Sequence, residues 1–236
     1  MSKWMDRFSK PGPGVYAPPP DRGVKRFFFL LPIHIRKLIL LNVLWILFSI
    51  PVVTLPAAST GVNFVLMKLA REGRCFLWDD FIEAFKKYFK KSLIALPLYL
   101  VIAATIVVCI VVEGPFALLL KIILCIVAFL CWLISCYFFP MLSYIDELSG
   151  KALMKNAFLL MLVSAKQDVF LTLFPGLLTA LQAIFLPLTA PLLVFLTLAL
   201  AQLGVCLIVN VPIDQYVLNP YNNMDGKDSN LGEKPE

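Results

Sequence analysis

The stretch of sequence that decides the fold is residues 36–74, RKLILLNVLWILFSIPVVTLPAASTGVNFVLMKLAREGR. Basic residues open and close it, and the residues between them are mostly apolar. Two prolines, Pro51 and Pro56, break the apolar run near its middle. Lys and Arg mark the cytoplasmic side of membrane proteins. Basic residues at both ends therefore predict a helical hairpin that enters and leaves a bilayer from the same side.

The alternative is a single crossing by residues 38–55. It would put the basic residues between positions 68 and 91 on the opposite side of the membrane from Arg36 and Lys37, against the positive-inside rule. Pro56 fits the first turn of a second helix, because its missing N–H would have no intrahelical partner there. Each arm is somewhat short, so the hairpin is expected either to cross at a tilt or to be re-entrant and shielded by other helices.

Composition points to a membrane protein as well. The chain has 236 residues, of which 60% are hydrophobic and 15% charged, whereas soluble domains are about 45–50% apolar and about 25% charged. The apolar residues lie in long blocks, which is the pattern of membrane spans. The formal charge of +6 is explained by cytoplasmic Lys and Arg. We therefore expect the lipid bilayer, and no nucleic acid, as a partner.

The rest of the chain extends this layout to an all-α, polytopic helical membrane protein. After the N-terminal helical hairpin, four transmembrane helices are expected, at residues 93–112, 116–139, 169–186 and 192–211, with a kink at Pro175. With both termini cytoplasmic, every Lys and Arg except Lys121 lies inside the cell. The expected divisions are a cytoplasmic or interfacial tail (1–35), a membrane domain (36–213) and a cytoplasmic tail (214–236), in a multi-pass protein of the cell membrane.

Two amphipathic segments are expected on the cytoplasmic side. Residues 75–91 have an apolar stripe at helical spacing and a charged opposite face. A second segment follows Ser149, a residue suited to cap the start of a helix. The first segment is expected to lie on the membrane surface or to dock on a partner, and the two interpretations are compatible. Its docking face would be Trp78, Phe81, Phe85 and Phe89.

Polar residues in the hairpin are the candidate binding site. They are Asn42, Thr54, Ser59, Thr60 and Asn63. One interpretation is that they hydrogen-bond between helices inside the bundle. The other is that they line a site near the turn, where a broken helix presents polar groups to a ligand.

Residues for catalysis or metal binding are missing from the pattern. The chain has six cysteines without a CxxC pair and one histidine, His34, so no zinc site of the usual spacing is expected. No GxSxG, HExxH or phosphate-binding glycine motif occurs. Asp79 and Asp80 are adjacent and so do not face one another on a helix. We expect no catalytic residues, no metal and no cofactor.

Several stretches together resemble the YesL-like family of bacterial integral membrane proteins, a domain of unknown function. They are KPGPGVYAPPP (10–20) with KRFF (25–28), LNVLWILFSIPVVTLPA (41–57), DFIEAFKKYFKKS (80–92), KNAFLLML (155–162) and IDQYV (213–217). The resemblance implies a bacterial cytoplasmic membrane protein of the Gram-positive type. Members are commonly found beside carbohydrate-uptake and glycan-degradation systems, which implies an accessory role there. The resemblance implies no catalytic residues.

Three function classes follow. The first is a non-catalytic accessory or regulatory protein that docks to a carbohydrate-uptake system, such as the subunits of a sugar ABC transporter. The second is a small transporter or channel with its site at the broken hairpin, although no deeply placed charge for ion coupling is evident. The third, an intramembrane enzyme, has the least support. The pattern leaves homo-oligomerisation open.

Overall fold

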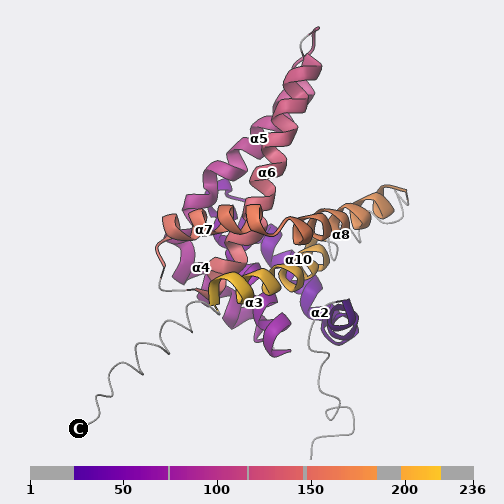
Figure 1. The fold of residues 1–236 in the computed structure, drawn as a ribbon. Helices are drawn as coiled ribbons and strands as arrows, with labels where there is room; N and C mark the ends of the chain where they lie inside the picture. Colours follow the sequence, from indigo (N-terminus) through magenta and orange to yellow (C-terminus); the bar gives the residue numbers. More distant parts are fainter. Residues whose placement is uncertain (1–23, 74, 116, 146–147, 185–197, 219–236) are drawn as a thin grey trace, which may run out of the picture.

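The computed structural model describes residues 24–73, 75–115, 117–145, 148–184 and 198–218 (Figure 1). These residues form helices joined by short connections, and no strand occurs among them. The α-helices are α2 (Val24–Ser49), α3 (Leu55–Glu72), α4 (Leu77–Ser92), α5 (Leu96–Val111), α6 (Ala117–Tyr144), α7 (Gly150–Val163), α8 (Ala165–Ile184) and α10 (Leu198–Ile213). Three short turns accompany them: the 3-10 turns η2 (Val52–Thr54) and η3 (Leu93–Ala95) and the π-helical turn η5 (Asp214–Leu218).

Several of these helices could cross a membrane. Among the described residues, five are long and apolar enough: Lys25–Ser49, Val52–Glu72, Leu77–Val111, Ala117–Tyr144 and Leu198–Val217. The pair Gly150–Val163 and Ala165–Leu177 also qualifies when taken together, although it is bent by 93°. The chain is therefore an all-α polytopic membrane protein, as the sequence predicts.

Helices α2 and α3 form the predicted hairpin, with η2 at its turn. Three side chains of α2 bind backbone carbonyl oxygens near the end of α3: Arg26 Nη2 to Arg71 at 2.8 Å, His34 Nε2 to Gly73 at 3.1 Å, and Lys37 Nζ to Cys75 at 2.8 Å. These bonds hold the first half of α2 beside the end of α3. Pro56 lies in the first turn of α3, as expected.

Helix boundaries differ from the expected ones in two places. Helix α2 begins at Val24 and contains Pro32, so residues 24–35 continue into the hairpin instead of forming a separate segment. Helix α8 passes through Pro175, and the sharp bend lies at Ser164, between α7 and α8. Ser149 caps α7 as predicted, because its Oγ accepts a hydrogen bond from the N–H of Ala152 at 3.3 Å.

Some expected features fall on residues that the structure does not describe. Residues 1–23 and 219–236 contain most of the two expected tails, and residues 185–197 contain the expected turn before the last span. At the C-terminal end of the described part, the boundary expected at residue 214 falls inside a continuous helical path, since α10 runs directly into η5.

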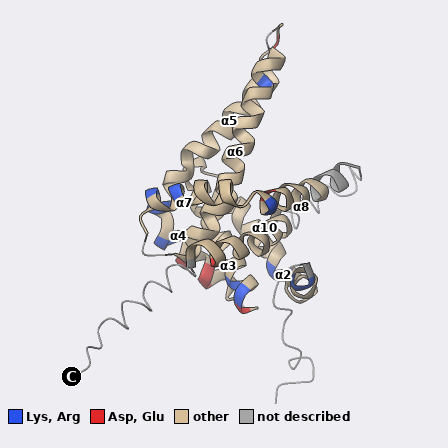
Figure 2. Ribbon diagram, in the orientation of Figure 1, with Lys and Arg blue, Asp and Glu red and all other residues tan. Residues whose placement is uncertain are grey.

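The core lies where α3 and the second half of α6 meet. Tyr137, Phe138, Met141 and Leu142 of α6 are fully buried. The first half of α6 pairs with α5 and extends away from the other helices (Figure 1). Lys and Arg gather on the body of the bundle around α3, α4 and α7, and are sparse along this extension (Figure 2).

Candidate functional site

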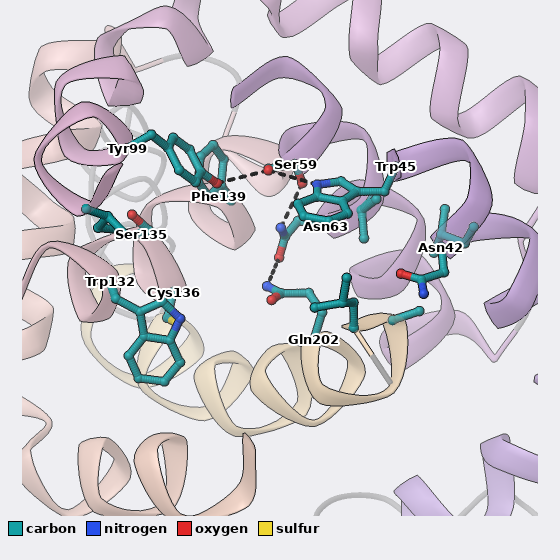
Figure 3. Close-up of a pocket in the computed structure, with 15 residues that line it drawn as sticks. Asn42, Trp45, Ser59, Asn63, Tyr99, Trp132, Ser135, Cys136, Phe139 and Gln202 are labelled. Carbon is teal, nitrogen blue, oxygen red and sulfur yellow. Dashed lines mark hydrogen bonds between the residues drawn. The ribbon is translucent and has the colours of Figure 1, made fainter. Parts of the chain in front are cut away.

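A cavity of about 260 Å³ lies among five helices, α2, α3, α5, α6 and α10 (Figure 3). Its lining residues are largely aromatic, aliphatic or uncharged polar. They are Leu41, Asn42, Trp45, Ser59, Val62, Asn63, Tyr99, Ile102, Trp132, Ser135, Cys136, Phe139, Leu198, Ala199 and Gln202. The hairpin supplies the first six, so the stretch that decides the fold also builds much of the site.

Ser59 connects three of the helices. Its Oγ accepts a hydrogen bond from the indole Nε1 of Trp45 on α2 at 3.1 Å, and another from the hydroxyl of Tyr99 on α5 at 2.9 Å. Trp45 and Ser59 face one another because the hairpin turn between them brings α2 back beside α3. Figure 3 shows both donors converging on the serine oxygen. One small hydroxyl thus sets the spacing of α2, α3 and α5 at the cavity.

Asn63, one helical turn after Ser59, connects α3 to α10. Its Nδ2 donates to the backbone oxygen of Ser59 at 2.8 Å. Its Oδ1 accepts from Gln202 Nε2 at 2.8 Å and from the thiol of Cys206 at 3.4 Å. Asn63 is almost fully buried, and this set of bonds satisfies both ends of its amide.

The structure brings together three of the five polar residues chosen from the sequence. Asn42, Ser59 and Asn63 line the cavity. Thr54 lies at the hairpin turn instead, where its hydroxyl donates to the carbonyl oxygens of Phe48 at 2.6 Å and Pro51 at 2.7 Å. Thr60 is fully buried and bonds the carbonyl oxygen of Pro56 in its own helix at 2.9 Å. These two threonines stabilise backbone and do not reach the cavity.

Other lining residues had weaker signals in the sequence. Trp45 lies three positions after Asn42, which puts both on one helical face. Gln202 is an amide inside an apolar run. Tyr99 and Trp132 look like ordinary aromatic residues of membrane helices, and only the fold shows that they meet the hairpin.

The cavity is uncharged. None of its described lining residues is Asp, Glu, Lys, Arg or His, and two ion pairs near the end of α3 lie outside it. Lys68 pairs with Asp80 and Arg71 with Asp214, at 2.8 and 2.7 Å. No group of three potential metal ligands occurs in the described part of the chain. The lining is suited to holding a molecule by shape and hydrogen bonds.

The expected docking face of α4 is divided by the fold. Phe81 is fully buried, and the ring of Phe48 from α2 lies 5.3 Å from it and 5.1 Å from Phe85, centroid to centroid. Phe85 and Phe89 are half-buried. Trp78 is 56% exposed. The apolar stripe of α4 therefore packs mainly on the protein's own hairpin, and of the four residues Trp78 is the most accessible.

The connection between α3 and α4 contains the buried Cys75. Burial raises the pKa of its thiol, and nearby Lys37 opposes this rise with a smaller effect. A thiol with a raised pKa is a poor nucleophile at neutral pH, because the thiolate is the reactive form. Cys75 is thus a packing residue here, and Lys37 binds its carbonyl oxygen.

Comparison with known proteins adds a family for part of the chain. Residues 38–110 match the model of a family described as a protein of unknown function, DUF624. The matched region contains most of the hairpin, α4 and nearly all of α5, which together supply eight of the fifteen lining residues. No curated protein and no solved structure matches the chain. The finer YesL-like assignment stays a prediction. Residues 38–110 are thus similar to a family whose function is unknown.

Proposed function

We propose that this protein is a non-catalytic accessory or regulatory partner of a carbohydrate-uptake system, such as a sugar ABC transporter, in the cell membrane. Both termini are cytoplasmic in this proposal, in agreement with the distribution of Lys and Arg. The resemblance to YesL-like proteins supports the carbohydrate setting. The observation that carries the proposal is the extension formed by α5 and the first half of α6.

This extension buries little of its own surface. Thr105 is the one buried side chain of α5 in the described structure, and its hydroxyl donates to Val101 at 2.9 Å within α5 and to Leu124 of α6 at 3.4 Å. Large apolar residues are exposed along both helices: Ile106, Val107, Ile110 and Val111 on α5, and Leu118, Leu119, Ile122, Ile123 and Ile126 on α6. Such a pair offers membrane helices of another protein two long faces to pack against.

A second exposed surface, which is aromatic, lies at the start of α4. Phe76 is 72% exposed, and Trp78 lies beside it on the same cytoplasmic side in the proposed topology. Aromatic residues are enriched at the centres of protein interfaces. We therefore assign cytoplasmic contacts with the partner to Phe76 and Trp78, and exclude the buried Phe81 from them.

The test is purification of tagged protein from native membranes in a gentle detergent, followed by mass spectrometry of what is recovered. Stoichiometric transporter subunits are expected with the wild type. Ile106→Trp, which adds bulk to α5, and Trp78→Glu, which charges the cytoplasmic surface, should each reduce recovery of the subunits. Ile50→Trp at the hairpin turn is the matched control and should retain them. Recovery of the protein alone, or equal recovery with all variants, would contradict the proposal.

A second candidate function, a small transporter or channel, has support from the cavity. The site lies between helices that could span a membrane, as in transporters that bind substrate between bundled helices. Asn42→Ala and Asn63→Ala should then abolish uptake of radiolabelled monosaccharide into proteoliposomes. Flux unchanged by both substitutions would exclude the cavity as its route.

A further inference from the structure

The cavity that Ser59 and Asn63 organise has a chemistry that selects its ligand. Its polar groups are the carboxamide of Asn63, two further carboxamides, hydroxyls and indole N–H groups. Its described lining contains no charged side chain. A charged molecule bound there would lose its hydration without gaining a counter-charge, which costs far more than burying a neutral polar group. The lining therefore favours an uncharged molecule over one that needs a counter-charge.

The cavity also has hydrogen-bonding capacity left for a ligand. Gln202 uses its Nε2 on Asn63, and its carboxamide oxygen makes no hydrogen bond to another described residue. The indole N–H of Trp132 likewise makes no hydrogen bond within the described part of the chain. Figure 3 shows Trp132 and Gln202 among the side chains that line the cavity. An acyl chain of a lipid would leave both groups without partners, at a cost of about 1–3 kcal/mol each.

Aromatic rings supply the remaining walls. Trp45, Tyr99, Trp132 and Phe139 all line the space, and flat rings pack well against the C–H faces of a small ring. The volume of about 260 Å³ is below the range of about 300–1,000 Å³ that holds drug-sized molecules. The space suits a molecule the size of one sugar ring.

We infer that this cavity binds a small, uncharged, hydroxyl-rich molecule of about monosaccharide size. Trp132 donates to it, Gln202 accepts from it, and the aromatic walls cover its apolar faces. The inference goes beyond the proposed partnership, because it requires no second protein and is tested on the purified chain.

Three probes of one ring size separate the alternatives: glucose is neutral, glucuronate is anionic and glucosamine is cationic. N-acetylglucosamine and myo-inositol extend the neutral set. Binding is followed by tryptophan fluorescence and by the rise in melting temperature that a ligand of the folded state produces. We expect at least one neutral probe to give a saturable change, with glucuronate and glucosamine at least about 100-fold weaker.

Matched variants assign the signal to the cavity. Trp132→Phe should remove most of the fluorescence change, whereas Trp78→Phe, on the surface of α4, should keep it. Ala199→Leu fills the cavity and should abolish the melting shift. Ala103→Leu, the same substitution on the exposed side of α5, should leave it unchanged. Retained binding by Ala199→Leu would overturn the assignment.

Three other results would also overturn the inference. The first is equal binding of the charged and neutral probes. The second is no binding of any neutral probe up to high millimolar concentration. The third is a phospholipid that stays bound in native mass spectrometry of the wild type and is lost from Ala199→Leu, which would make the site a lipid site. If no transporter subunits are recovered in the purification experiment, the proposed partnership fails but this inference is not affected. The failure of one is therefore distinguishable from the failure of the other.

Discussion

Gly61 sets the distance between α3 and α4. A Cβ atom at this position would lie 2.8 and 2.9 Å from two ring carbons of Phe81 and 3.3 Å from the Phe81 carbonyl oxygen. Small residues allow membrane helices to approach this closely. Phe81 is thereby held against the hairpin, which explains why the apolar face of α4 is turned inward.

Gly61→Ala should therefore destabilise the protein by about 1–3 kcal/mol, because Phe81 or the α4 backbone has to move. Thermal unfolding in detergent, followed by circular dichroism, would measure this change. Gly176→Ala is the control, since a Cβ there meets no atom within 4 Å. Equal melting temperatures for wild type and Gly61→Ala would show that the contact has room to relax. Phe81→Leu should restore part of the loss if the ring is the obstacle.

Asn63 joins α3 to α10 through its side-chain hydrogen bonds, and Asn63→Ala tests how much these bonds stabilise the protein. Gln202 and Cys206 would lose their shared acceptor inside the bundle, and an unsatisfied buried polar group costs about 1–3 kcal/mol. The same unfolding measurement should show lower stability for this variant. Asn156→Ala, on the partly exposed face of α7, should stay close to the wild type. An unchanged melting temperature for Asn63→Ala would mean that the amide does not tie α3 to α10.

At the scale of elements, η5 is fastened to the end of α3. Arg71 Nη2 pairs with Asp214 Oδ1 at 2.7 Å, and its guanidinium carbon lies 3.8 Å from the centre of the Tyr144 ring of α6. The IDQYV stretch, which the sequence places at the start of a tail, is thus the point where three elements meet.

Asp214→Asn should loosen this junction, because the ion pair and part of the bond to Arg71 are lost. Hydrogen exchange of the backbone amides of η5 should then become faster, while exchange in the core of α6 stays unchanged. Gln215→Ala, at an exposed neighbouring position, serves as control and should exchange like the wild type. Unaltered exchange in Asp214→Asn would show that helix packing alone holds η5.

The elements themselves were largely predictable. Basic ends and the two prolines indicated the hairpin, and Ser149 indicated the start of α7. The bend at Ser164 was missed because no proline or glycine marks it. The inward direction of α4 was not predictable, since periodicity identifies an apolar face but contains no information about which surface covers it.

At the scale of the molecule, composition alone was sufficient to indicate a membrane protein, because long apolar runs with few charges are typical of membrane-spanning helices. The cavity was predictable only in part. Its hairpin residues lie close in sequence, but Gln202 is 139 positions from Asn63. Contacts of that separation depend on how α10 packs, which no local pattern encodes.

The hairpin is the central claim, because it joins the charge pattern, the α2–α3 contacts and the cavity. The most direct test is labelling of single cysteines introduced at Arg36 and Glu72, both exposed, with a membrane-impermeant maleimide in right-side-out and inside-out vesicles. Cys75, Cys136 and Cys206 are buried, and the other three native cysteines lie in apolar helices, so the wild type should give little background.

Gly114→Cys, at the tip of the α5–α6 extension, reports the opposite side. We expect both hairpin positions to be labelled only in inside-out vesicles and Gly114→Cys only in right-side-out vesicles. Labelling of Arg36→Cys and Glu72→Cys from opposite sides would contradict the hairpin.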